Sequence, residues 1–129
     1  MNGRYLLDTN VIIALLAGEA GVGSGLATAD EVFFPSTGIG ELYYGARKSS
    51  RPSENLARID ELVLTNAVLA CDSETARRYG EIKHALRIKG RPLPENDIWI
   101  AALARQYDLT LVTRDTHFEQ IDNLNLIAW

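Results

Sequence analysis

A chain of 129 residues that is 47% hydrophobic has the size and composition of one compact domain, and we expect a single domain over residues 1–129. The lone cysteine, Cys71, excludes an internal disulfide. No segment has the apolar length of a membrane span or the plan of a signal peptide, so the sequence predicts a cytoplasmic protein with no membrane partner. The formal net charge of −4 taken alone argues against a nucleic-acid partner.

Basic residues are concentrated in the middle of the chain. Between Arg47 and Arg91 lie ten of the thirteen Lys and Arg residues against six acidic ones, which gives +4, while the remainder carries −8. A polyanion could approach this basic middle while cations bind among the acidic residues elsewhere. The same bases equally fit the solvated face of one helix, and both interpretations stay open. The bases in question are Arg77, Arg78, Lys83, Arg87 and Lys89.

The first elements in chain order are a strand and a helix. Residues 5–7 form a short apolar run that ends in Asp8-Thr9-Asn10, three residues that favour helix caps, and an apolar helix is expected over residues 11–16. Four glycines crowd residues 18–25, which predicts a mobile loop rather than a helix or strand. A brief helix is expected over residues 26–30.

A second strand, a helix pair and a third strand follow. The second strand covers residues 32–35 and ends in proline, after which Ser36 is expected to cap a helix. The buried stripe of that helix consists of Ile39, Leu42, Tyr43 and Ala46. Apolar residues at helical spacing predict another helix over residues 56–63, and residues 68–71 give the third strand, in which Cys71 is a small core residue.

The last part of the chain contains two long helices and two strands. Residues 73–89 form the longest expected helix, which Gly90 ends. Pro94 opens a helix that is apolar on nearly every side. Residues 109–113 and 124–128 give the fourth and fifth strands. Strands separated by helices imply parallel pairing through right-handed crossovers. The sequence therefore predicts an α/β fold, a three-layer α/β/α sandwich with a central parallel sheet of about five strands.

Four acidic residues each follow a strand end or lie near a helix start: Asp8, Glu41, Asp97 and Asp115. In an open parallel sheet such positions meet at the carboxyl edge of the strands, where ligands collect. At an effective dielectric of about 20, two unit charges about 4 Å apart repel by about 4 kcal/mol. Four carboxylates brought together must therefore take up protons or bind a cation.

Three of these acids also have a possible local role. Asp8 could cap the helix that follows it, Asp97 could compensate the dipole in the first turn of its helix, and Asp115 could cap a turn over residues 116–120. Glu41 fits such a local role least well. A shared site explains all four residues at once.

The ligand set indicates the kind of ion. Zinc is disfavoured because Cys71 stands alone and His84 and His117 are far apart in sequence. Clusters of carboxylate oxygens suit Mg²⁺ or Mn²⁺, and two such ions can activate a water and stabilise the leaving oxygen in phosphoryl displacement. The chain has no Walker-type phosphate loop, Gly-x-Ser-x-Gly elbow or dinucleotide fingerprint. These features predict a metal-dependent hydrolase.

The four acids with their neighbours resemble the PIN-domain ribonucleases, and most closely the VapC-type toxins of prokaryotic toxin-antitoxin pairs. The resemblance covers essentially the whole chain. It rests on Asp8-Thr9-Asn10, Gly40-Glu41-Leu42, Asn96-Asp97, and Val112-Thr113-Arg114-Asp115 with Phe118 beyond. It implies a PIN-like fold, endonucleolytic cleavage of RNA with one or two Mg²⁺ or Mn²⁺ ions, 5′-phosphate and 3′-hydroxyl products, homodimerisation, and inhibition by a cognate antitoxin that blocks the active site.

The same resemblance assigns roles to individual residues. Asp8, Glu41 and Asp97 are expected to be core metal ligands, with Asp115 as the fourth acid. Two polar residues are expected to support them, Thr113 beside the cluster and Asn10 in the first loop. Arg114 has two open interpretations, a phosphate contact or a plain ion pair.

Other functions remain open at this stage. A phosphatase or phospho-acceptor domain could use a similar sheet, but it would need a second aspartate in an Asp-x-Asp pair, and position 10 is asparagine. The chain could also be a PIN-like nuclease that is not a toxin. The remaining alternative is a non-catalytic interaction domain whose acidic rim binds a basic partner.

Overall fold

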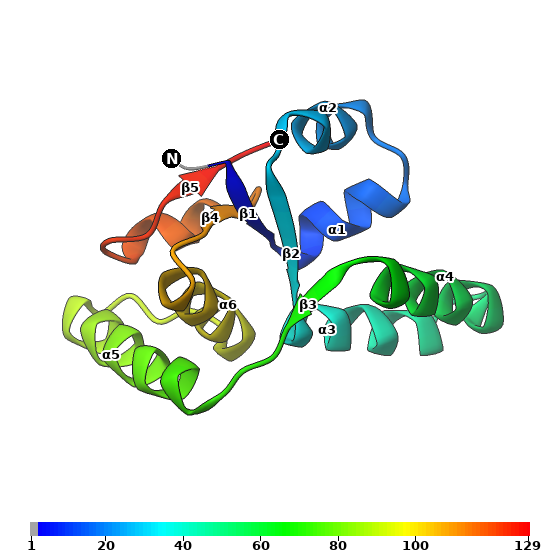
Figure 1. The fold of residues 1–129 in the computed structure, drawn as a ribbon. Coiled ribbons are helices and arrows are strands. Elements are labelled where there is room, and N and C mark those ends of the chain that lie inside the picture. Colours follow the sequence, from blue (N-terminus) through cyan, green and yellow to red (C-terminus); the bar gives the residue numbers. More distant parts are fainter. Residues whose placement is uncertain (1–2) are drawn as a thin grey trace.

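A computed structural model of the protein describes residues 3–129 and contains a parallel sheet of five strands (Figure 1). In spatial order the sheet runs β3-β2-β1-β4-β5, and every neighbouring pair is parallel. The strands are β1 (Arg4–Leu7), β2 (Glu31–Pro35), β3 (Ala67–Leu69), β4 (Thr110–Val112) and β5 (Leu126–Ile127). The expected parallel sheet of about five strands is confirmed.

Helices cover both faces of this sheet (Figure 1). They are α1 (Thr9–Leu16), α2 (Ala20–Thr28), α3 (Ser36–Arg47), α4 (Pro52–Thr65), α5 (Ser73–Lys89) and α6 (Glu95–Gln106), together with a short 3₁₀ helix, η1 (Thr116–Gln120). One face packs against α5 and α6, and the other packs against α1, α3 and α4. The three-layer α/β/α architecture predicted from the sequence is confirmed.

The two hydrophobic cores follow from the alternation of side chains along the strands. In β1, Leu6 packs into the core with α5 and α6, and Leu7 packs into the core on the opposite face. In β4, Leu111 and Val112 divide in the same way. Successive residues of a strand point to opposite faces, so a strand buried on both sides is mostly apolar, although β4 also buries Thr110. This tendency explains the apolar runs before Asp8 and before Thr113.

The glycine-rich segment differs from its prediction, because it is helical rather than a mobile loop. Helix α2 includes Gly21, Gly23 and Gly25, and the expected helix over residues 26–30 is its last part, which ends at Thr28. The indole of Trp129 explains one of these glycines, since a Cβ at position 25 would lie 2.2 Å from the indole Cδ2. Packing against a distant residue thus overrides the low helix propensity of glycine.

Several element boundaries also shift from their predictions. Ser36 does not cap α3, because Pro35 occupies the N-cap position and Ser36 is already the first helical residue. The third strand ends at Leu69, which leaves Cys71 outside the strand, although it still packs against the core with α5 and α6. The fourth and fifth strands are each shorter than expected. The long helix over residues 73–89 is confirmed, and it ends at Gly90 in a left-handed conformation with φ 66°.

The bases of α5 lie mostly beside acidic residues. Arg77 and Arg78 both pair with Glu74, one turn away. Lys83 pairs with Glu95, and Lys89 pairs with Asp122. This pairing favours the interpretation of a solvated helix face over that of a polyanion-binding surface.

Within residues 3–129, no single helix is long and apolar enough to cross a membrane; α1 and α2 meet the length and composition criterion only as a pair, bent by 107°.

Candidate active site

Asp8 lies at the carboxyl end of the central strand β1 and is only 3% exposed. Its carboxylate accepts two hydrogen bonds, from the backbone N of Thr9 at 2.9 Å and from Oγ1 of Thr113 at 2.8 Å. Asp8 is also the N-cap residue of α1. Asp8 therefore does cap α1, as considered from the sequence, but capping uses only one carboxylate oxygen. The other oxygen accepts the hydrogen bond from Thr113, which follows β4.

The four acids predicted from the sequence line one cavity of about 240 Å³. Asp8 follows β1, Glu41 lies in the second turn of α3, Asp97 lies in the first turn of α6, and Asp115 follows β4. Thr9, Asn10 and Ile13 of α1 complete the lining. Residues separated by more than a hundred positions thus come together at the carboxyl edge of the sheet, as expected for an α/β fold.

Two of the remaining carboxylates, those of Glu41 and Asp115, each accept one side-chain hydrogen bond. Oγ1 of Thr9 donates to Oε1 of Glu41 at 3.2 Å. Nδ2 of Asn10 donates to Oδ2 of Asp115 at 3.4 Å. Thr113 Oγ1 also accepts from the backbone N of Asp115 at 3.1 Å. Asn10 and Thr113, the two supporting residues expected from the sequence, thus both contact acids of the cavity.

Burial and mutual repulsion disfavour ionisation of two of these acids. The pKa of Asp8 is raised to about 6 because burial, with a smaller contribution from the charges of Asp97 and Asp115, outweighs the lowering effect of the hydrogen bonds from Thr113 and Thr9. Burial also raises the pKa of Asp97, against the lowering effect of His117, while Glu41 and Asp115 raise it. A proton or a bound cation would therefore stabilise this cluster.

The chemistry of the donor set fits a hard divalent cation, because the four acids offer only oxygen ligands. Oδ1 of Asn10 is buried and has no hydrogen-bond partner within the described residues, so the cavity also contains an acceptor that a hydrated ion could satisfy. In the part of the chain that the structure describes, no group of three or more His, Cys, Asp or Glu side chains is arranged to hold an ion as it stands.

Sequence reasoning missed two contacts of this site. It considered His117 only as a zinc ligand, yet its Nε2 lies 2.8 Å from Oδ2 of Asp97. It considered Thr9 only as part of a capping segment, yet Thr9 bonds Glu41. The available signal for His117 was its place two residues beyond Asp115, in a turn that begins at the edge of the sheet.

The structure also bears on the ion pair considered for Arg114 and the capping role considered for Asp115. Arg114 lies 3.1 Å from Oε1 of Glu19, which favours the plain ion pair over a phosphate contact. Asp115 occupies the N-cap position of η1, but its side chain makes no capping hydrogen bond. Its carboxylate is directed to Asn10 instead, so the capping role does not explain Asp115.

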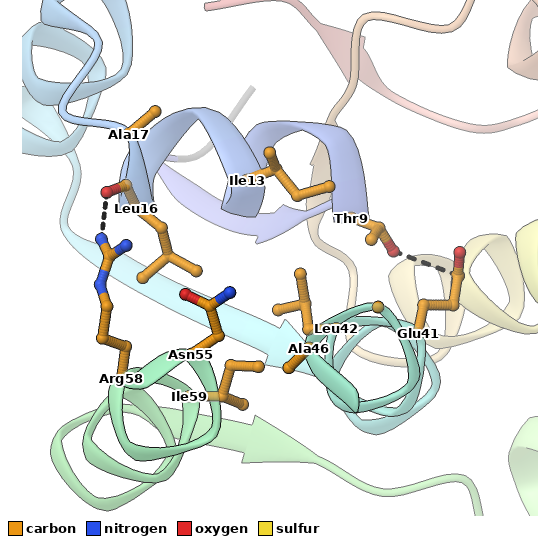
Figure 2. Close-up of a pocket in the computed structure, with 11 residues that line it drawn as sticks. Thr9, Ile13, Leu16, Ala17, Glu41, Leu42, Ala46, Asn55, Arg58 and Ile59 are labelled. Carbon is orange, nitrogen blue, oxygen red and sulfur yellow. Dashed lines mark hydrogen bonds between the residues drawn. The ribbon is translucent and has the colours of Figure 1, made fainter. Parts of the chain in front are cut away.

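A larger cavity of about 440 Å³ adjoins the acidic one, between α1, α3 and α4 (Figure 2). The two cavities share three lining residues, Thr9, Ile13 and Glu41. The larger one is otherwise mainly apolar, and Ile13 is 54% exposed at its edge. At its far end the guanidinium of Arg58 donates to the carbonyl of Leu16 (Figure 2). An apolar surface thus extends directly from the acidic cluster.

A parallel sheet with a carboxylate-lined cavity at its carboxyl edge is typical of metal-dependent hydrolases that act on phosphodiesters. The chain belongs to the PIN domain family, whose sequence model matches residues 5–124. Ribonucleases of this family depend in general on divalent metal ions. This membership favours a nuclease over the phospho-acceptor alternative.

Individual relatives and solved structures are similar over nearly the whole chain. Ribonuclease VapC2 of Haemophilus influenzae is 33% identical over 98% of both chains, and the tRNA(fMet)-specific endonuclease VapC of Shigella flexneri is 34% identical over 98% of both chains. The structure of VapBC2 from Rickettsia felis bound to a promoter DNA fragment matches with a TM-score of 0.89 at 28% identity, covering 98% of both chains. DNA-bound VapBC from Salmonella typhimurium matches with a TM-score of 0.89 at 29% identity, again over 98% of both chains.

Proposed function

We propose that the protein is a metal-dependent endoribonuclease, formed by one nuclease domain over residues 1–129, and that it is the toxin of a type II toxin-antitoxin pair. The observation that carries the proposal is the cavity lined by Asp8, Glu41, Asp97 and Asp115. The names of the relatives, ribonucleases and a tRNA-specific endonuclease, support RNA as the substrate. Because one of them is specific for a tRNA, tRNA is the first substrate to test.

The four acids are proposed to hold one or two Mg²⁺ or Mn²⁺ ions. A bound ion supplies charge neutralisation and activation of water for in-line attack on the phosphodiester. The chain's own residues orient the ligands, because Thr113 holds Asp8, Thr9 holds Glu41 and Asn10 holds Asp115. Hydrogen bonds of this kind restrict the rotation of a carboxylate, which reduces the entropy that the site loses when an ion binds.

The proposed partners are a cognate antitoxin and a second copy of the chain. The structural relatives are VapBC toxin-antitoxin complexes, which supports an antitoxin for this chain. The apolar cavity with the exposed Ile13 adjoins the acidic one, so a partner bound there would also cover the acids (Figure 2). We place the protein in the cytoplasm, where its RNA substrate is found.

Cleavage of RNA by purified protein tests this proposal. The protein, freed of antitoxin, is incubated with tRNA or single-stranded RNA and Mn²⁺ or Mg²⁺, and the product ends are mapped. Wild-type protein is expected to cut and to leave 5′-phosphates, and Asp8→Asn is expected to lose cutting. Glu61→Gln, which removes an exposed acid of α4, is the matched control and should cut normally. Undiminished cutting by Asp8→Asn, or by wild-type protein in EDTA, would contradict the proposal.

A further inference from the structure

His117 contacts Asp97, one of the four acids that line the cavity, and the proposed function assigns it no role. It is the second residue of η1, which begins directly after Asp115. Its imidazole contacts the ring of Phe118, with centroids 4.8 Å apart and planes tilted by 38°, and Phe118 is fully buried in the core. The ring of His117 is therefore held next to the cluster by the packing of its neighbour.

The contact of His117 with Asp97 is close, and the His117 side chain is itself 37% exposed. Nε2 of His117 lies 2.8 Å from Oδ2 of Asp97, whose side chain is 15% exposed. That nitrogen is buried, and among residues 3–129 it has no hydrogen-bond partner of regular geometry, so the Asp97 carboxylate is the acceptor within reach. The 2.8 Å separation is within hydrogen-bond range, so a directed N–H···O bond needs a change of orientation rather than a closer approach.

Each of the other three acids accepts a side-chain hydrogen bond from a neighbouring residue. Asp8 is held by Thr113, Glu41 by Thr9 and Asp115 by Asn10, in each case through one side-chain donor. Asp97 is the remaining acid, and the nitrogen of His117 is the side-chain group that lies against it. An outer group that fixes one oxygen of a carboxylate leaves the other oxygen free for an ion and limits the orientations that the ligand can adopt.

From this arrangement we infer that His117 is a positioning residue for the metal site, which holds Oδ2 of Asp97 so that Oδ1 is available to a divalent ion. This inference rests on the proposed function. It differs from a direct role in chemistry, because His117 acts through Asp97. The loss of such an outer partner typically weakens metal affinity about 10- to 100-fold.

Three variants test the role of His117. His117→Phe keeps an aromatic ring against Phe118 but removes the donor, and His117→Gln keeps an N–H group at a position close to that of Nε2. His84→Phe makes the first substitution at the other histidine of the chain, which is exposed on α5. Calorimetric titration with Mn²⁺ measures affinity in each protein, and thermal melting without metal measures folding.

His117→Phe is expected to bind Mn²⁺ about 10- to 100-fold more weakly than wild type while remaining folded, and His117→Gln and His84→Phe should bind nearly as wild type does. Raising the Mn²⁺ concentration should then restore the kcat of His117→Phe on RNA with little change in KM, which a general loss of structure would not allow. If His117→Phe does not fold, His117→Leu against His117→Gln makes the same comparison.

Two results would overturn the inference. One is an unchanged Mn²⁺ affinity in His117→Phe, which would make the contact incidental. The other is a nitrogen hyperfine coupling from His117 in the electron spin-echo spectrum of the Mn²⁺-loaded protein, because the imidazole would then be a ligand itself. Failure of wild-type protein to bind Mn²⁺ and cut RNA would instead refute the proposed function, so the two failures are distinguishable.

Discussion

Replacing Asp8 by asparagine should stabilise the metal-free protein at neutral pH. Burial raises the pKa of Asp8 from 3.8 in the unfolded chain to about 6 in the folded one. Between these values the folded state binds more protons than the unfolded state. The contribution of Asp8 to the free energy of unfolding is therefore largest below pH 4, and it is lost as the pH rises through about 6. Asparagine cannot ionise, so the variant escapes this loss.

The magnitude follows from the shift. About two pKa units, at about 1.4 kcal/mol each, give about 3 kcal/mol at pH 7. Asp8 is 3% exposed, so solvent screening reduces this figure little. Asparagine also keeps the local contacts, because its amide oxygen can accept from the backbone N of Thr9 and its amide nitrogen can donate to the hydroxyl of Thr113, which acts as donor or acceptor.

Urea denaturation of both proteins in EDTA, at pH values from 4 to 8, measures this effect. The difference between the two free energies of unfolding should be near zero at pH 4 and reach up to about 3 kcal/mol above pH 6. Carboxylates with lowered pKa, such as Asp72, Glu95 and Asp122, act in the opposite direction, but they are present in both proteins and cancel. A difference that stays constant across this pH range would refute the reasoning.

Three further predictions concern metal, helix packing and charge. Mn²⁺ should raise the melting temperature of wild-type protein at pH 7.5, with a shift that shrinks towards pH 4 as protons compete for the same oxygens; a constant shift would contradict the proposed ligands. Gly25→Ala should lower the free energy of unfolding by about 1–3 kcal/mol, measured in thermal melts, because the added methyl group clashes with Trp129. Gly23→Ala, which has open space around it, should stabilise the protein slightly. Equal effects of the two substitutions would refute the packing argument. Arg114→Ala should leave RNA cleavage within a few-fold of wild type because Arg114 pairs with Glu19. A large loss of cleavage would instead favour the interpretation that Arg114 contacts a phosphate.

The acids were predictable because their positions depend on local patterns and one topological rule. An apolar run that ends at Asp8, and another that ends before Asp115, mark strands whose carboxyl ends share an edge in any open parallel sheet. Glu41 and Asp97 then follow from helices that begin on the same side. The sequence does not indicate that burial raises the pKa of Asp8 to about 6, because that depends on how completely the side chain is enclosed.

The features that were missed depend on partners far away in the chain. Helix α2 is rich in glycine, which on propensity alone predicts a loop, yet Trp129 packs on Gly25 and the indole also contacts Tyr5 edge to face at 5.1 Å. His117 offers no periodic signal because it lies in a five-residue 3₁₀ turn, and its approach to Asp97 depends on the packing of Phe118. Local rules therefore identify the acids better than the residues that orient them.

The strand order explains how the supporting residues reach the four acids. Strand β1 is central, with β4 as one neighbour, so the segment after β1 and the segment after β4 lie side by side. The first segment supplies Thr9 to Glu41 and Asn10 to Asp115, and the second supplies Thr113 to Asp8 and His117 to Asp97.

Each acid is thus contacted by a side chain from a different part of the chain. Because these contacts are shared between segments, disturbing one segment loosens ligands that it does not itself carry. Residues linked in this way respond to substitution as a unit rather than as independent sites. For this reason we expect the supporting residues Thr9, Asn10, Thr113 and His117 to matter to metal binding jointly, although none of them is an acid.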